Sequence, residues 1–378
     1  MKKLISILSL ITVIIVLGYT LPVGSSFTPV QTSPLQIAYE FTSSASTHTI
    51  CIITVGDHDS SCLKTEDGVT NTNPRWSPDG QWLLYEQSSP GISASYLHSI
   101  ESGLSEKVDL ALWSSLIVDW SPDGMLFTVI GMTGPDANRE LYSVKTDGSE
   151  LQALTRTAPP LSHPVWSPDG RQIAYISGIP EGTLTVISST GENQRTLTTD
   201  LDVDPEVPPM WSPDSTRIAF VIRNKMVGTD QLRDIYLINA DGTNLQQLTD
   251  NYAINLDPQW SPDGTQLVFY GYETGAFDPN NTKSLGTEVF RINADGSDFT
   301  NLTQSAGLDY EPMWSPDGNL IAFASTRQWE SEAFRGGIFI ITPDGKDVAM
   351  ITDLPPFDGQ SFQEAHKPVW RPIPTKLE

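Results

Sequence analysis

Cysteine, histidine and basic residues are scarce in this chain, and their scarcity argues against several classes of function. The 378 residues include two cysteines, five histidines and 22 lysines plus arginines. A structural zinc site takes four ligands, so two cysteines alone are not expected to bind metal. The 46 aspartates and glutamates give a formal net charge of -24, which opposes binding to nucleic acid or to an anionic membrane surface.

Two common signatures of catalytic and nucleotide sites are also missing. The chain contains no Gly-x-Ser-x-Gly motif, and the nearest stretch, residues 91–95, lacks the second glycine. It contains no glycine-rich phosphate loop. We therefore expect no catalytic residue and no cofactor. A divalent cation at an acidic surface, described below, is the alternative to a protein without metal.

One long apolar run stands at the amino terminus. After Lys2 and Lys3, residues 4–17 are apolar except for three hydroxyl residues. The run is shorter than the roughly 20 residues of a transmembrane helix, so we expect residues 1–20 to be a signal peptide, with an uncleaved signal anchor as the alternative. Residues 21–36 are rich in Ser, Thr and Pro and are expected to form a linker. These segments predict an extracytoplasmic protein that is secreted, periplasmic or membrane-anchored.

The dominant feature of the sequence is a repeated Trp-Ser-Pro-Asp-Gly motif. It occurs in full at Trp76–Gly80, Trp120–Gly124, Trp166–Gly170, Trp260–Gly264 and Trp314–Gly318, with a near copy at Trp211–Ser215 and a degenerate copy at Trp370. Neighbouring tryptophans are 44 to 56 residues apart. Self-similarity at such a period is typical of repeat architectures. The tryptophans are predicted to be structural, as large apolar surfaces packed between neighbouring repeats.

Each repeat has the pattern of four β-strands. Ser-Pro-Asp-Gly suits a type I turn at the tip of a hairpin. A run of β-branched and aromatic residues follows, for example residues 218–221, and then a second run, at residues 235–238. A tight Asp-Gly turn and a short strand ending in Leu-Thr complete the unit, here at residues 241–249. Four strands per unit is the composition of a propeller blade.

The two ends of the chain complement one another. Residues 37–64 supply three strands without a first, whereas residues 367–370 form a first strand with nothing after it. Joined to the six full units, they make a seventh blade and leave no open sheet edge. We therefore predict an all-β, seven-bladed propeller of four-stranded blades over residues 37–373, closed by pairing of the terminal strands, with a tail at residues 374–378. Six blades with loose ends are the alternative.

The two cysteines fall in the blade that carries this closure. Cys51 and Cys62 lie on adjacent predicted strands, on either side of residues 56–57. Export favours a disulfide over free thiols. A disulfide between them would staple this blade.

The later repeats are longer than the others. Their extra residues fall between the second and third strands, at residues 223–234, 271–288 and 325–337. Insertions in a repeat fold often mark its binding face. The aromatic residues of these insertions are candidate binding anchors, with local loop cores as the alternative: Tyr272, Phe277, Trp329 and Phe334.

Acidic residues gather just before the tryptophan strands, where they should line the mouth of the central channel. The candidates are Asp204, Glu206, Asp257, Asp309 and Glu311. An acidic mouth could attract a basic peptide or a divalent cation, and a solvated acidic surface is the alternative. His163 and His366 occupy similar positions and could face the channel, but no third metal ligand is indicated.

The repeat unit resembles the TolB-type β-propeller repeat. The resemblance rests on Trp-Ser-Pro-Asp-Gly, an Ile-Ala-Phe-like strand, an Ile-Asn-x-Asp-Gly turn and Leu-Thr, and it is clearest at residues 218–249, 267–303 and 321–352. No counterpart of the amino-terminal domain of TolB is expected before residue 37. The family includes envelope proteins that bind protein partners, gating propellers of prolyl-oligopeptidase-like peptidases and polysaccharide lyases. The resemblance therefore implies the fold and leaves the function open.

The resulting hypothesis is an exported, non-enzymatic and monomeric scaffold. It would bind a protein or peptide partner through its loop face and acidic channel mouth. A polysaccharide-acting lyase or hydrolase that uses the same face is one alternative. A membrane-anchored sensor ectodomain is the other.

Overall fold

All secondary structure in the described part of the chain is β-strand, as the sequence predicts. The computed structural model describes residues 34–373 apart from residues 45–46, 58, 157–159, 179, 228–229, 252, 274–285, 306, 328–334 and 353–362. The expected signal segment, most of the linker and the tail therefore lie outside the described residues, as do Phe277, Trp329 and Phe334. Over the described ranges, no helix has the length and apolar character needed to cross a membrane.

The strands form antiparallel groups of four, and the first strand of each group ends at a repeat tryptophan. The first two groups in sequence are β4 (Thr70–Trp76), β5 (Trp82–Ser89), β6 (Ile92–Ser99) and β7 (Ser105–Lys107), then β8 (Ser114–Trp120), β9 (Leu126–Met132), β10 (Glu140–Lys145) and β11 (Gln152–Ala153). The next two are β12 (Leu161–Trp166), β13 (Gln172–Ser177), β14 (Thr183–Ser188) and β15 (Arg195–Thr196), then β16 (Met210–Trp211), β17 (Arg217–Val227), β18 (Asp230–Asn239) and β19 (Gln246–Gln247). Two more follow: β20 (Ala253–Trp260), β21 (Gln266–Glu273), β22 (Glu288–Asn293) and β23 (Thr300–Asn301), then β24 (Asp309–Trp314), β25 (Ile321–Ser325), β26 (Arg335–Ile341) and β27 (Val348–Met350).

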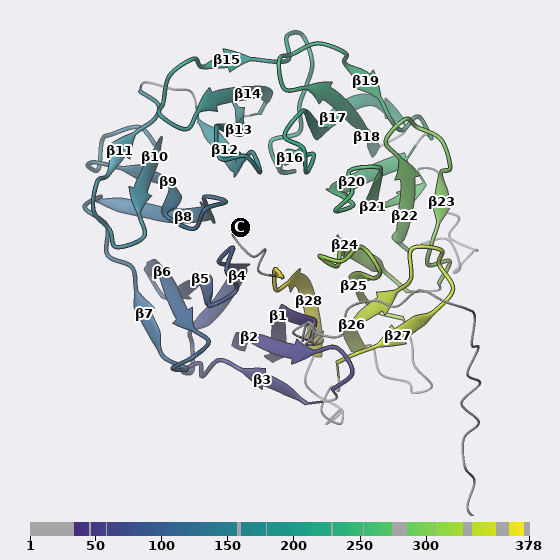
Figure 1. Ribbon diagram of the computed structural model, residues 1–378, viewed down its shortest axis with the longest axis horizontal. Helices are drawn as coiled ribbons and strands as arrows, with labels where there is room; N and C mark the ends of the chain where they lie inside the picture. Colours follow the sequence, from purple (N-terminus) through teal and green to yellow (C-terminus); the bar gives the residue numbers. More distant parts are fainter. Residues whose placement is uncertain are drawn as a thin grey trace, which may run out of the picture. The chain divides into compact units, whose positions relative to one another are not determined.

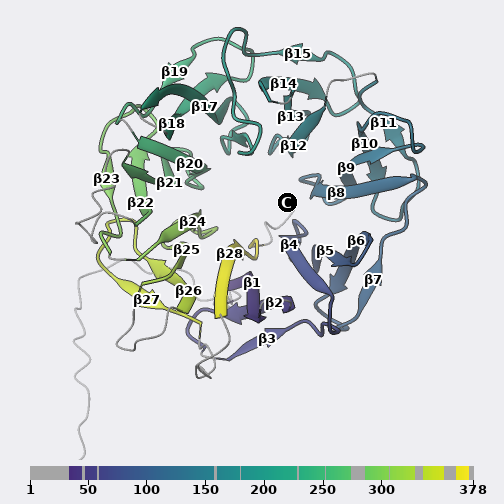
Figure 2. The ribbon, with the colours of Figure 1, turned by 180° about the vertical axis from the view of Figure 1, so that it is seen from behind.

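The remaining group combines strands from both ends of the chain. It consists of β28 (Gln363–Trp370), β1 (Gln36–Ser44), β2 (Thr47–Thr54) and β3 (Ser60–Cys62). β28 pairs antiparallel with β1, with Ile37 opposite Trp370 and Phe41 opposite Ala365. In Figures 1 and 2 the yellow β28 lies beside the purple β1, and the groups follow one another around a common centre.

The Ser-Pro-Asp-Gly segments form hairpin turns that are stabilised by their own side chains. In the first copy the Ser77 hydroxyl donates to Asp79 Oδ1 at 2.5 Å and accepts the Trp82 N–H at 2.9 Å. Gly80 has φ of 67°, in the left-handed region where a glycine costs least. The Ser–Asp bond recurs in the other copies, at Ser121, Ser167, Ser212, Ser261 and Ser315. Because these bonds are local, the turns were predictable from the motif.

The repeat tryptophans connect neighbouring groups. Each is buried, with 5 to 8% of its surface exposed. In four of them the indole N–H donates to the backbone carbonyl that precedes the tryptophan of the previous group, at 3.0 to 3.1 Å: Trp76 to Val369, Trp211 to Val165, Trp260 to Met210 and Trp370 to Met313. Such a partner offsets the cost of burying an indole N–H, so these four bonds help to fix how one group is set against the next.

The terminal strands also share apolar cores with the groups on both sides. One cluster joins Ile37 of β1 and Trp370 of β28 to Ala322 of β25. Another joins Ala38 of β1 to Trp76 and Leu83 of the group that follows. Burial of these side chains on both faces stabilises the strands by the hydrophobic effect.

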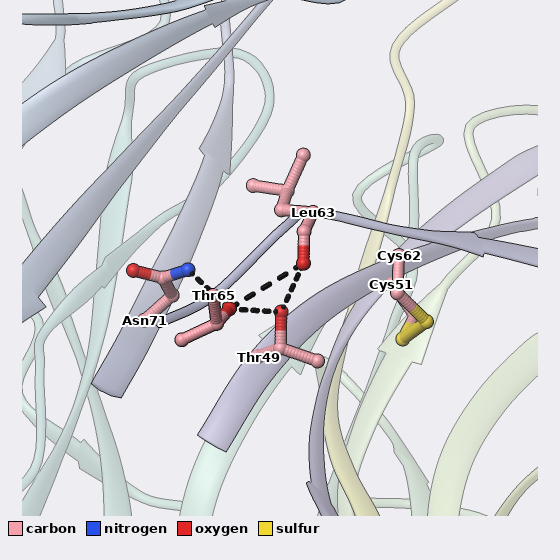
Figure 3. The surroundings of a disulfide bond; sticks show 6 residues. All are labelled: Thr49, Cys51, Cys62, Leu63, Thr65 and Asn71. Atoms are coloured by element: carbon pink, nitrogen blue, oxygen red, sulfur yellow. Dashed lines mark hydrogen bonds between the residues drawn. A yellow bond between two sulfur atoms is a disulfide. The ribbon is translucent and has the colours of Figure 1, made fainter. Parts of the chain in front are cut away.

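The predicted disulfide between Cys51 and Cys62 is present and crosses from β2 to β3. Figure 3 shows the hydrogen bonds beside it: Thr49 Oγ1 donates to the Leu63 carbonyl, and Thr65 Oγ1 donates to Thr49 Oγ1, both at 2.8 Å. Asn71 of β4 donates to Thr65 at 2.9 Å. The disulfide therefore ties the outer strand β3 to β2, and the hydrogen bond from Asn71 links the segment after β3 to the start of the following group.

The first predicted insertion, residues 223–234, is an extension of a hairpin. β17 and β18 stay paired along their whole length, as far as Val227 opposite Asp230. Two arginines fix this extension to the acidic stretch before β16: Arg223 pairs with Asp202 at 2.6 Å, and Arg233 pairs with Asp204 at 2.5 Å. The extra residues therefore lengthen the sheet.

Candidate functional site

A repeated irregularity in the first strands creates the candidate site. Three residues before a repeat tryptophan, and directly before a proline, five residues adopt a left-handed backbone with φ of 48 to 56°: Asn73, His163, Asp257, Glu311 and Lys367. The strand pairing shifts at each of them, as in a β-bulge. A left-handed non-glycine residue costs of order 1–3 kcal/mol. Side chains at these bulges line a common space.

That space is a cavity of about 500 Å³ at the centre of the strand groups, and every group contributes to its wall. Besides the five bulge residues, the wall includes the residue directly before each repeat tryptophan. Of these, Arg75, Asp119 and Gln259 are polar, and Val165, Met210, Met313 and Val369 are apolar. The cavity thus has charged and apolar sides, as small-ligand sites commonly do.

Two of the predicted mouth residues are buried ion-pair partners. Asp204 and Asp309 are fully buried. Arg233 pairs with Asp204, and Arg327 pairs with Asp309 at 2.9 Å. The expectation of an exposed acidic mouth therefore differs from the structure at these two positions. Their partners lie on neighbouring segments, and burial of an ionised carboxylate is costly unless it is paired and hydrogen-bonded.

Glu206, Asp257 and Glu311 do line the cavity. The Glu206 side chain is 76% exposed and lies 3.3 Å from Arg233. Burial raises the pKa of Asp257, and a hydrogen bond from Gln259 Nε2 at 3.0 Å opposes the rise. Burial also raises the pKa of Glu311, to about 7, although its Oε2 accepts the Lys367 N–H at 2.7 Å. The acidity of the cavity wall is therefore weaker near neutral pH than the sequence suggests.

The two histidines have different positions. His163 lines the cavity, and burial together with the positive charge of Arg75 lowers its pKa. His366 Nε2 lies 3.5 Å from the buried Glu40 carboxylate and its Nδ1 lies 3.9 Å from Glu311. Burial lowers the pKa of His366 as well. Across the described part of the chain, no three His, Cys, Asp or Glu side chains are grouped so that they could hold a metal ion.

Arg75 and Asp119 are cavity residues that sequence reasoning did not identify as site residues. Both stand directly before a repeat tryptophan. Their position could have identified them. Successive side chains of a strand point to opposite sides, so a residue directly before a tryptophan that packs between groups does not point the same way as that tryptophan. Tyr272, the described member of the loop aromatics, lies at the end of β21 and is 38% exposed.

Glu311→Gln is expected to stabilise the protein at pH 8 and to change its free energy of unfolding little at pH 5. The native pKa of about 7 lies above the ordinary value of 4.5, so the native state binds the proton more tightly than the unfolded state does. The free energy of unfolding of the wild type therefore falls as the pH rises from about 4.5 to about 7, by at most about 3 kcal/mol. Glutamine removes this titration and keeps an oxygen for the Lys367 N–H.

Urea unfolding at pH 5 and pH 8 measures the effect. Glu192→Gln, at an exposed position, is the matched control and should give the same difference from wild type at both pH values. A stability difference between Glu311→Gln and wild type that does not change with pH would contradict the prediction.

Comparison with known proteins places the fold in a family. A family model described as the TolB beta propeller domain matches residues 26–200 and 131–278. An uncharacterized protein of Agrobacterium fabrum is 29% identical over 262 residues, which are 66% of this chain and 83% of that protein. A TolB homolog of Chlorobium luteolum is 30% identical over 134 residues, which are 27% of this chain and 31% of that protein. The match thus spans about a third of the TolB homolog.

Among solved structures, an oligogalacturonate lyase in complex with manganese is similar with a TM-score of 0.58 and 17% sequence identity. The likeness covers 87% of this chain and 89% of the lyase, and at this identity it shows the fold alone. The family model accounts for more than half of the chain, and the repeat motif and strand groups agree with it. The chain therefore belongs to the TolB β-propeller family.

Proposed function

We propose that this protein is an exported β-propeller scaffold that binds a protein or peptide partner in its central cavity. The observation that carries the proposal is the convergence of charged side chains from several strand groups on one cavity of about 500 Å³. A cavity of this size suits a small ligand or a few residues of an extended chain. The carboxylates and cations of its wall can accept from and donate to a peptide backbone.

We infer that the strand groups are seven blades of a closed ring. The pairing of β28 with β1 supports the closure. The indole bonds support it as well, since Trp76 donates to β28 and Trp370 of β28 donates to β24. Arg371 adds a contact across the same junction, from its Nε to the Gly80 carbonyl at 2.8 Å.

We also propose that the protein works outside the cytoplasm. The disulfide between Cys51 and Cys62 supports this location, because structural disulfides persist in oxidising compartments. The apolar run at residues 4–17, after Lys2 and Lys3, is typical of an export signal. Amino-terminal sequencing of the mature protein distinguishes a cleaved signal peptide from an anchor.

Capture of the partner from the native envelope tests the proposal. The tagged full chain is crosslinked in place and purified as wild type and as Asp257→Asn/Glu311→Gln. Asparagine tolerates the left-handed backbone at residue 257, so this pair of changes removes charge with little strain. We expect the double variant to recover at least ten-fold less of the partner, because amides replace the two carboxylates that would accept the N–H groups of the peptide backbone.

Glu106→Gln/Glu192→Gln is the matched control. It removes the same two charges at exposed positions of the outer strands and turns. Partner recovery should equal that of the wild type. Equal recovery by the cavity variant and this control would exclude Asp257 and Glu311 from the binding site.

The alternative of a polysaccharide lyase or hydrolase has the support of a fold likeness only. The same fold carries unrelated functions, so such a likeness does not assign an activity. Incubation of the full chain with oligogalacturonate, followed by absorbance of unsaturated products, would reveal a lyase.

A further inference from the structure

We propose that the cavity binds a carboxylate attached to an apolar stem, with the Arg75 guanidinium as its anchor, and that the carboxyl-terminal residue of the partner peptide supplies this group. This inference rests on the proposed function, and it identifies the carboxyl terminus of the partner peptide as the end that enters the cavity. The residue before each tryptophan lies two positions nearer the Ser-Pro-Asp-Gly turn than the bulge residue, so the two positions form successive levels of the cavity wall. Arg75 is an exposed residue of the level nearer the turns.

Arg75 differs from the other cations of the cavity wall in its pairing. Arg233 pairs with Asp204 and Glu206, and Lys367 Nζ lies 3.2 Å from Glu40. For Arg75, in the described ranges, no carboxylate oxygen lies within 4.0 Å of the guanidinium. Its one hydrogen bond there is a long one, from Nε to the Val118 carbonyl at 3.5 Å. The two terminal nitrogens of its fork are therefore available to a ligand.

The charge of Arg75 acts on residues from several groups. Burial raises the pKa of Asp119 on β8 and of Asp257 on β20, and the positive charge of Arg75 opposes the rise in both. Burial and the same charge lower the pKa of His163 on β12. The Arg75 guanidinium thus lines the cavity close enough to three other strand groups for its charge to act on them.

The carboxylates of the wall already have donors from the chain itself, which favours an anionic ligand over a cationic one. Asp119 Oδ1 accepts the Trp120 N–H at 2.9 Å, Asp257 accepts from Gln259, and Glu311 accepts from the backbone of Lys367. In contrast, the two terminal nitrogens of the Arg75 guanidinium have no acceptor among the described residues. Arginine binds carboxylates by two parallel N–H donors, which gives both strength and orientation.

The apolar side of the same level would hold the stem. Val165, Met210, Met313 and Val369 occupy the position that Arg75 occupies in its own strand. Methionine side chains adapt to ligands of different shape. A terminal residue with an apolar side chain can place its carboxylate on Arg75 and its side chain on this surface. The preceding N–H groups can then donate to Asp257 and Glu311 nearer the mouth.

Calorimetric titration of the full chain with three probes tests the inference. The probes are an N-acetylated peptide of three alanines and a terminal leucine with a free carboxylate, the same peptide as its carboxyl-terminal amide, and N-acetylleucine. We expect the free acid to bind at least ten-fold more tightly than the amide, as a charge-assisted hydrogen-bond pair implies. N-acetylleucine should bind at least ten-fold more weakly than the peptide acid, because it does not reach the mouth.

Arg75→Gln should remove the preference for the acid over the amide. Arg171→Gln is the matched control, since Arg171 lies on a Ser-Pro-Asp-Gly turn with 84% of its side chain exposed, and it should keep the preference. Equal binding of acid and amide by the wild type, or no binding of either, would overturn the anchor. N-acetylleucine binding as tightly as the peptide acid would overturn the assignment to a peptide end in favour of a small carboxylate.

Partner capture separates this inference from the proposed function. If Arg75→Gln lowers partner recovery together with the acid preference, both stand. If it leaves recovery at the wild-type level while Asp257→Asn/Glu311→Gln lowers it, the binding cavity stands and the carboxylate anchor falls.

Discussion

Deletion of residues 363–378 is expected to abolish cooperative folding. The deletion removes β28, which is the antiparallel partner of β1, and it removes the buried Trp370 from the core shared with Ile37. It also removes the Val369 carbonyl that accepts the Trp76 indole N–H. The free energy of unfolding of a domain is about 5–15 kcal/mol. The loss of a strand together with its core side chains is expected to cost more than that. Differential scanning calorimetry should show no cooperative transition.

Two controls limit this interpretation. Deletion of residues 374–378 alone leaves β28 intact and should leave the transition unchanged. Trp370→Ala should cost about 3–5 kcal/mol, as for other buried aromatic residues, whereas Trp113→Ala, at a site 62% exposed, should change stability by less than about 0.5 kcal/mol. A normal transition after loss of β28 would refute closure of the ring by the terminal strands.

Arg327→Leu is expected to destabilise the protein by about 3–5 kcal/mol. Asp309 is fully buried, and Arg327 Nη2 lies 2.9 Å from its Oδ2. The hydroxyl of Ser305 also donates to Asp309, at 2.8 Å, but it carries no charge. Leucine would leave a buried carboxylate without a counterion. Equilibrium urea unfolding at pH 7 measures the loss.

A second substitution tests whether the charge is the cause. Asp309→Asn in the Arg327→Leu background removes the unpaired charge and should recover part of the lost stability. Lys346→Ala breaks an exposed pair with Asp344 and should change stability far less than Arg327→Leu does. If Arg327→Leu cost no more than Lys346→Ala, the burial of this ion pair would not matter for stability.

The candidate site was only partly predictable from the sequence. Asp257 and Glu311 were identified because they belong to the acidic residues just before the repeat tryptophans, and the structure brings both to the cavity. Asp204 and Asp309 looked equivalent to them, but their arginine partners are 29 and 18 residues away in the sequence. Sequence spacing does not show which distant cation reaches a carboxylate. Arg75 was missed because the position it occupies holds a different kind of side chain in most repeats.

The sequence by itself determined the all-β repeat architecture, the turns and the disulfide. These features depend on local chemistry, as in the bond from Ser77 to Asp79, or on strands that are adjacent in the chain, as for Cys51 and Cys62. The tertiary structure decided which charges are neutralised and which face the cavity. The left-handed bulges direct side chains into the cavity, and the arginine partners of Asp204 and Asp309 come from other segments of their own strand groups, so both depend on how the folded sheet brings distant residues together.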